Sequence, residues 1–178
     1  GGTGASRTVT VTPASNQSGS ATITLTVSDG TASTTDTFVL TVGGVNDVPT
    51  ISDVANQATN EDTATGELAV TLGDEETAAA DLTLSVSSSA QGLVPDANIV
   101  LGGTGASRTV TVTPASNQSG SATITLTVSD GAASTTDTFV LTVDAVNDVP
   151  TISDVANQAT NEDTATGELA VTLGDEET

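Results

Sequence analysis

The chain repeats itself with a period of 101 residues. The stretch that begins at Gly1 begins again at Gly102, and only three of the 77 overlapping positions differ. These positions are Thr31/Ala132, Gly43/Asp144 and Gly44/Ala145. Solenoid units run about 20–50 residues, whereas about one hundred residues is a common size for a free-standing domain. Each repeat is therefore expected to have its own hydrophobic core.

The linker between repeats is expected at the sequence VNDVPTISD, which begins at Val45 and again at Val146. This sequence combines turn-forming residues with a proline that favours extended backbone in the residue before it. The chain then holds the C-terminal part of one repeat (1–44), one complete repeat (45–145) and the N-terminal part of a third (146–178). Because these limits do not coincide with domain edges, we expect the chain to be part of a longer array.

Alternating hydrophobic residues predict an all-β fold. A short strand is expected near Ile99–Leu101 and an irregular first strand near Ile51–Ala58. The rows with clear alternation lie at Leu68–Leu72, Leu82–Val86, Arg108–Thr113, Ala122–Val128 and Phe139–Val143. The total of about seven strands is typical of an immunoglobulin-like β-sandwich. Because Phe139 is the only aromatic residue of the complete repeat, its core is expected to be mostly aliphatic.

The composition removes most catalytic chemistry. The chain has no Cys, His, Met, Trp, Tyr or Lys, and its only basic residues are Arg7 and Arg108. Without a thiol or an imidazole there is no cysteine nucleophile, no Ser-His-Asp triad and no zinc site built on sulfur or nitrogen. Paired carboxylates can cleave glycosidic bonds, but here no aromatic platform for a sugar accompanies them and the same pairs recur in every repeat. We therefore expect that the protein is not an enzyme.

The net charge of −21 narrows the choice of partners. Such a charge repels phosphate backbones and anionic membrane surfaces, which argues against nucleic acid as a partner and against direct membrane insertion. No stretch approaches the roughly 20 apolar residues of a membrane-spanning helix. The expected partners are neighbouring repeats of the same chain, with lateral self-association in a fibre as an open alternative.

The acidic residues of the complete repeat gather in loops. Residues 45–145 hold 13 acidic residues against one arginine, a net charge of −12. The clusters are Asn60–Asp62, Asp74–Glu76, Asp130 before a glycine turn, and Asp144–Asp148 at the linker. Crowded like charges cost free energy unless water, salt or a bound cation screens them. Calcium takes oxygen ligands at about 2.3–2.6 Å from carboxylates, amides and backbone carbonyls. The pattern favours calcium ligands, and the alternative is a solvated acidic surface.

The linker region also resembles a known family. The segment LTVSDGAASTTDTFVLTVDAVNDVP, from Leu126 to Pro150, is similar to the end of a cadherin or bacterial cadherin-like repeat. In that family an Asp follows the penultimate strand, and a linker of the type D-x-N-D-N-x-P binds calcium. The stretch VTPASNQSGSATITLTVSDG resembles the tandem repeats, about one hundred residues each, of giant bacterial surface adhesins. The resemblance implies an immunoglobulin/cadherin-like sandwich with Ca2+ at the junctions between repeats.

Carried over position by position, the resemblance implies two sets of calcium ligands. At the linker around Asn147 they would be Glu61, Asp144, Asn147 and Asp148, joined by Asp175 and Glu177 of the following repeat. At the linker around Asn46 they would be Asn46, Asp47, Asp74, Glu76 and Asp130.

The sequence departs from the family pattern at several positions. The last Asn of the linker motif is replaced by Val48 or Val149, the linker Asp of the first junction is replaced by Gly43, and no Leu-Asp-Arg-Glu element is present. Fewer ions per junction than in cadherins are therefore expected, with the first junction the weaker of the two.

These features predict a calcium-stiffened structural spacer repeat of a large extracellular bacterial adhesin or cell-surface fibre. One alternative is the subunit of a self-assembling filament, in which the partial repeats at the two ends complete adjacent subunits by strand complementation. The stretch 78–101 would be missing from that pairing. A second alternative is a glycan- or protein-binding module, for which the sequence offers no aromatic hot spot.

Overall fold

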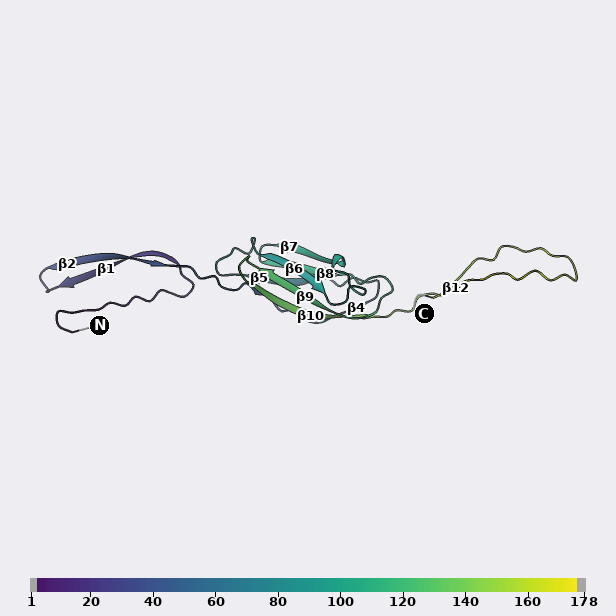
Figure 1. Ribbon diagram of the computed structural model, residues 1–178, viewed down its shortest axis with the longest axis horizontal. Coiled ribbons are helices and arrows are strands. Elements are labelled where there is room, and N and C mark those ends of the chain that lie inside the picture. The colour runs from purple at the N-terminus through teal and green to yellow at the C-terminus, as the bar shows by residue number, and fades with distance from the viewer. Residues whose placement is uncertain (1–2, 176–178) are drawn as a thin grey trace. The chain divides into compact units, whose positions relative to one another are not determined.

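Two four-stranded sheets form the complete repeat in the computed structural model, which describes residues 3–175 (Figure 1). The first sheet has the strand order β4 (Gln57–Asn60), β10 (Ser134–Asp144), β9 (Gly120–Ser129) and β6 (Thr83–Ser88). The second has the order β3 (Thr50–Ile51), β5 (Leu68–Gly73), β8 (Ser107–Val112) and β7 (Ile99–Thr104). Strands β4 and β10 are parallel, and the other neighbouring strands are antiparallel. This is an immunoglobulin-like β-sandwich, so the expected all-β fold is confirmed.

The strands expected from alternation are all present, and the first one is divided between the sheets. Strand β3 pairs with β5 in one sheet, and β4 pairs with β10 in the other. The connection between β3 and β4 therefore crosses from one sheet to the other. The only helical element among residues 3–175 is the short 3-10 helix η1 (Asp96–Asn98).

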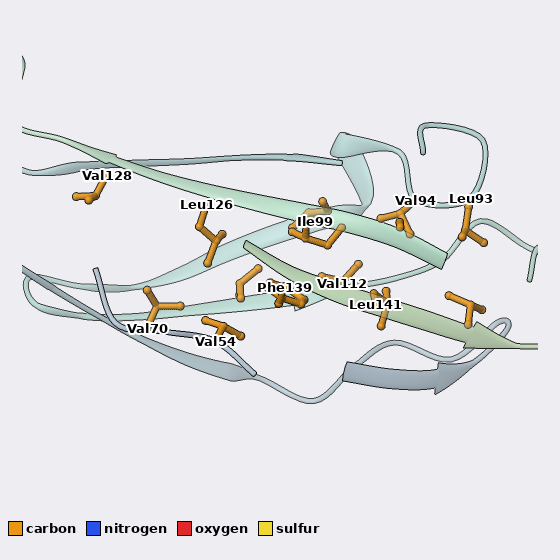
Figure 2. Packing of buried hydrophobic residues seen from close by; sticks show 14 of the residues in the cluster. Val54, Val70, Leu93, Val94, Ile99, Val112, Leu126, Val128, Phe139 and Leu141 are labelled. Carbon is orange, nitrogen blue, oxygen red and sulfur yellow. The ribbon is translucent and has the colours of Figure 1, made fainter. Parts of the chain in front are cut away.

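The hydrophobic core lies between the two sheets and follows the alternation of the strands. In β9 the side chains of Ala122, Ile124, Leu126 and Val128 are buried, while the intervening hydroxyl residues are not. Figure 2 shows labelled side chains from both sheets, such as Val112 and Leu126, in the space around Phe139. Sixteen hydrophobic residues form this cluster, and all except Phe139 are aliphatic. The expectation of a mostly aliphatic core is therefore met.

The chain divides into two compact units between Val48 and Pro49, within the segment expected to be a linker. In the first unit β1 (Gly19–Ser28) pairs with β2 (Ser33–Val42) in the same register as β9 with β10. Residues 3–18 form no strand, although the identical sequence at 104–119 contains all of β8. Strand β8 pairs with β5 and β7, whereas residues 1–48 contain no sequence equivalent to β5 and only the last three residues of β7.

The last residues of the second unit also form fewer strands than the same sequence forms in the complete repeat. Strands β11 (Thr151–Ile152) and β12 (Leu173–Gly174) pair as β3 does with the end of β5. Residues 158–161 are identical in sequence to β4 but form no strand. Because identical sequences differ in structure, the presence of a pairing strand decides which of these segments become β-strands.

Candidate calcium-binding ends of the repeat

The linkers leave the complete repeat at opposite ends of its strands, and the acidic residues gather at these ends. At one end, Asn60 of β4 faces Asp144 of β10 just before the second linker. At the other end, Gly73 of β5 faces Thr50 just after the first linker. Asp74 follows Gly73, and Asp130 lies in the turn that joins β9 to the start of β10. The structure thus brings Glu61 together with Asp144, and places Asp74 and Asp130 at the opposite end.

Glu61 connects the last strand of the sandwich to the second linker. Its side chain is buried, with 7% exposed. Its backbone N–H donates to the carbonyl oxygen of Asp144 at 2.9 Å. Its carboxylate Oε1 accepts the backbone N–H of Val146 at 2.5 Å. A hydrogen bond to a charged acceptor is stronger than one between neutral groups, so this contact ties the start of the second linker to the sandwich.

Asp74 presents its two carboxylate oxygens to different surroundings. Oδ1 accepts the backbone N–H groups of Glu76 at 3.0 Å and Thr77 at 2.7 Å. Oδ2 is buried and, among the described residues, has no hydrogen-bond partner. A buried polar atom without a partner costs about 1–3 kcal/mol. A carboxylate oxygen in this state fits the ligand chemistry of a hard cation such as calcium.

Asp130 uses one carboxylate oxygen to close its turn. Oδ1 accepts the N–H groups of Ala132 and Ala133, both at 2.6 Å. Its counterpart Asp29 accepts the N–H groups of Thr31 and Ala32 at 2.8 Å in the first unit. The hydrogen bonds from Ala32 and then Thr31 lower the pKa of the Asp29 carboxyl below its ordinary value of 3.8.

The remaining predicted ligands lie in the linkers and near the chain end. In each linker an asparagine side chain donates to the carbonyl of the following Asp, Asn46 to Asp47 at 2.7 Å and Asn147 to Asp148 at 2.6 Å. Asn46 and Asp47 belong to the first unit, whereas the other predicted ligands belong to the second. Glu76 and Asp175 are exposed, and Glu177 lies outside the described residues. Across residues 3–175, no three acidic side chains gather closely enough to hold a metal ion by themselves.

Residues 46–144 match the family model of the bacterial Ig domain. The chain belongs to this family. A bacterial Ig domain is a structural module, which agrees with the expectation of a non-enzymatic repeat of the surface-protein type. No curated protein matches the chain. Among the described residues, no helix has the length and apolar character needed to span a membrane.

The bacterial Ig domain is also similar to solved structures. The titin M3 domain is 17% identical, with 54% of this chain and 96% of that one covered and a TM-score of 0.41. The titin Z1Z2 domains in complex with telethonin are 15% identical, with 71% of this chain and 62% of that one covered and a TM-score of 0.47. An endo-fucoidan hydrolase of glycoside hydrolase family 107 is 24% identical, with 75% of this chain and 20% of that one covered and a TM-score of 0.41.

Asp137 and Arg108 make hydrogen bonds near the end of the bacterial Ig domain that carries Asp74 and Asp130. Neither residue was predicted to have this role. Asp137 accepts the N–H of Val54 on Oδ2 at 2.9 Å. Arg108 donates from Nε to the carbonyl of Gly105 at 2.9 Å and from its guanidinium to that of Leu82 at 3.4 Å. Both lie in phase with the buried residues of their strands, and this phase is the sequence signal that would have found them.

Proposed function

We propose that this bacterial Ig domain is a calcium-stiffened structural spacer of a large extracellular adhesin or cell-surface fibre. The buried, unpaired Oδ2 of Asp74 is the observation that carries the proposal. It leaves an oxygen of the kind that calcium prefers at the end of the repeat where the first linker arrives. The opposite end presents a second group of acidic residues around Glu61.

The chain supplies ligands for one junction at each end. Asp74, Glu76 and Asp130 would act with Asn46 and Asp47 at the first linker. At the second linker the ligands would be Glu61, Asp144, Asn147, Asp148, Asp175 and Glu177. Because acidic side chains alone do not form a cluster, each ion also needs backbone carbonyls, asparagine amide oxygens or water.

The expected consequence of calcium binding is mechanical. The complete repeat carries a net charge of −12, and its acidic loops lie where neighbouring repeats are joined. A bound divalent cation lowers the repulsion between these loops and connects oxygen atoms on both sides of a linker. The hydrogen bond from Val146 to Glu61 already restricts one linker, so the ion would add to an existing constraint.

Thermal unfolding of the 178-residue chain in calcium, in magnesium and with a chelator tests the proposal. A ligand that binds only the folded state stabilises it by about 2.7 kcal/mol at one hundred times its Kd. We expect the melting temperature to rise with calcium, to rise less with magnesium and to fall again when the chelator is added. A melting temperature that is the same in all three conditions would rule out calcium as a structural ligand.

A further inference from the structure

The first sheet of the complete repeat ends in an open strand edge at β6. The strand order β4-β10-β9-β6 leaves β6 with a single neighbour, β9. Beyond the end of β6 this ladder continues, because the backbone N–H of Ser89 donates to the carbonyl oxygen of Thr123. Hydrogen-bonded and non-hydrogen-bonded pairs alternate in an antiparallel ladder. The backbone groups of Leu84, Val86 and Ser88 therefore point away from β9, toward the open edge.

The sequence of this edge favours pairing with another strand. Residues 82–88 read LTLSVSS and contain no charged residue, proline or glycine. Segments of six or seven residues with high β-propensity, low charge and no proline are the ones that pair with the same segment of other chains. Folded proteins protect such edges with charged side chains, with bulges or by covering them. We therefore expect a protective feature at β6.

The side chains of Gln91 and Asp96 occupy the backbone groups of Ser88 at this edge. The N–H of Ser88 donates to Asp96 Oδ1 at 2.7 Å, and its carbonyl oxygen accepts Gln91 Nε2 at 2.9 Å. The two side chains are also joined to each other, because Gln91 Nε2 donates to Asp96 Oδ1 at 2.7 Å. In addition, Gln91 Oε1 accepts the backbone N–H of Asp96 at 3.0 Å. We call these two side chains the edge cap.

The segment between the two residues of the edge cap is anchored in the core. Leu93 and Val94 are both buried. The N–H of Val94 donates to the carbonyl oxygen of Ala90 at 2.7 Å, and the carbonyl oxygen of Leu93 accepts the N–H of Ala115 at 2.8 Å. The tertiary structure of the repeat therefore holds the edge cap against β6.

We propose that the edge cap keeps β6 from pairing with β6 of a second copy of the chain. All three edge-facing residues take part when two copies pair antiparallel about Val86. Val86 then lies opposite Val86, and Leu84 of each copy lies opposite Ser88 of the other. The edge cap already engages both backbone groups of Ser88. Two of the three hydrogen-bonded pairs are therefore blocked while the edge cap is in place.

A second copy is the partner that fits this edge because the edge is complementary to itself. A twofold contact brings the same patch of both copies together. The complete repeat has a net charge of −12, but β6 itself carries no charge. Two acidic repeats can therefore meet along β6 without placing carboxylates of the strand opposite each other.

Sedimentation velocity and hydrogen exchange of the 178-residue chain, both measured in chelator, test the proposal. Asp96→Ala removes the acceptor of the Ser88 N–H, and Gln91→Ala removes the donor to the Ser88 carbonyl. We expect both variants to form more of a two-chain species than the unmodified chain as the concentration rises. In these variants the amides of Leu84 and Val86 should exchange about tenfold more slowly at high than at low concentration. In the unmodified chain their exchange should not depend on concentration.

Two substitutions separate the edge cap from its charge. Asp96→Asn keeps a side-chain oxygen for the Ser88 N–H but removes the negative charge. Asp81→Ala removes an exposed charge that lies just before β6. Both variants should behave as the unmodified chain does, because the hydrogen bonds at Ser88 are kept.

A second comparison tests the position of the contact. Ser85→Asp and Ser87→Asp, added to Asp96→Ala, place like charges opposite each other in the proposed register and should abolish the two-chain species. The matched control adds Thr136→Asp and Thr138→Asp, which place two charges on the exposed face of β10, away from the open edge. This control should associate as Asp96→Ala does.

The melting temperature of the complete repeat, measured for every variant, shows whether it is folded. If Asp96→Ala fails to fold, Gln91→Ala decides the question. Folded variants that match the unmodified chain in association and in amide exchange would overturn the proposal. Equal association of Asp96→Asn or Asp81→Ala would assign the effect to charge and would overturn it as well. Because every measurement is made in chelator, these outcomes leave the proposed calcium-stiffened spacer unaffected.

Discussion

Asp74 uses one carboxylate oxygen in the fold, and its other oxygen is the one proposed to bind calcium. Oδ1 holds the turn after β5 by accepting two backbone N–H groups, and Oδ2 is buried without a hydrogen-bond partner among the described residues. An amide in place of the carboxylate keeps an oxygen for the turn and removes the buried charge. The structural role and the proposed metal-binding role of this residue are therefore separable.

Asp74→Asn is expected to have opposite effects with and without calcium. In chelator the free energy of unfolding should stay the same or rise by about 1 kcal/mol, because a buried charge has been removed. In calcium the variant should lose most of the stabilisation seen in the unmodified chain. Urea denaturation measures both values, and Asp53→Asn, which removes an exposed charge, is the control. An equal loss of stability in both conditions would show that Asp74 acts only in the fold.

Glu61 has a natural control in the next repeat. Glu61 is buried and accepts the N–H of Val146, whereas Glu162 has the same neighbours in sequence but is exposed. Glu61→Ala should lower the free energy of unfolding by about 1.5–3 kcal/mol, the value of a hydrogen bond to a charged group. It should also speed hydrogen exchange at the Val146 amide. Glu162→Ala should change neither quantity. Slow exchange at Val146 in Glu61→Ala would contradict the assigned role.

At the scale of elements, the duplicated hairpin separates local sequence from packing. Phe38 in β2 and Phe139 in β10 have identical neighbours in sequence and the same strand register, but they are 37% and 1% exposed. Phe139→Leu should destabilise the complete repeat by about 1–3 kcal/mol, and Phe38→Leu should change it by less than about 0.5 kcal/mol. Urea denaturation of the two variants makes the comparison. Equal effects would mean that the first unit buries its hairpin in solution.

The β1–β2 turn should respond to acid through Asp29. Its carboxyl pKa is lowered by hydrogen bonds from Ala32 and Thr31, so its folded pKa lies below the unfolded value. The stabilisation of the turn is therefore fully present above pH 3.8 and is lost as the pH falls through the lowered pKa. NMR titration of the Asp29 carboxyl and of the Thr31 and Ala32 amides should show a common midpoint below 3.8. A midpoint at or above that value would contradict the effect of these hydrogen bonds.

Period-two alternation predicted the strands because each strand has one face in the core. The rows at Ala122–Val128 and Phe139–Val143 lie within β9 and β10, and their hydrophobic residues are buried. The crossing from β3 to β4 was not predictable in this way, since it depends on which strands the first segment meets. Nor does alternation indicate that Glu61 is buried or that Oδ2 of Asp74 has no partner, because both are consequences of tertiary contacts in loops.

At the scale of the whole molecule, the near-identity of the repeats is typical of a segment whose function depends on its length and stiffness. The repeats differ at only three of 77 overlapping positions, so successive junctions offer nearly the same oxygen ligands. The exception is the first linker, where Gly43 stands in place of Asp144. If calcium stiffens the array, Gly43→Asp should raise the calcium affinity of the first junction. Isothermal titration calorimetry measures this gain. An unchanged affinity would show that an aspartate at this position of the linker is not a calcium ligand.

The backbone order parameters of the linker amides test calcium stiffening most directly. In 15N relaxation measurements, the amides of Asn147 and Asp148 should reach about 0.85 in calcium, the value of rigid backbone, and fall below about 0.6 in chelator. The strands of the complete repeat should stay rigid in both conditions. Linker amides that are equally mobile with and without calcium, beside rigid strands, would contradict a calcium-stiffened spacer.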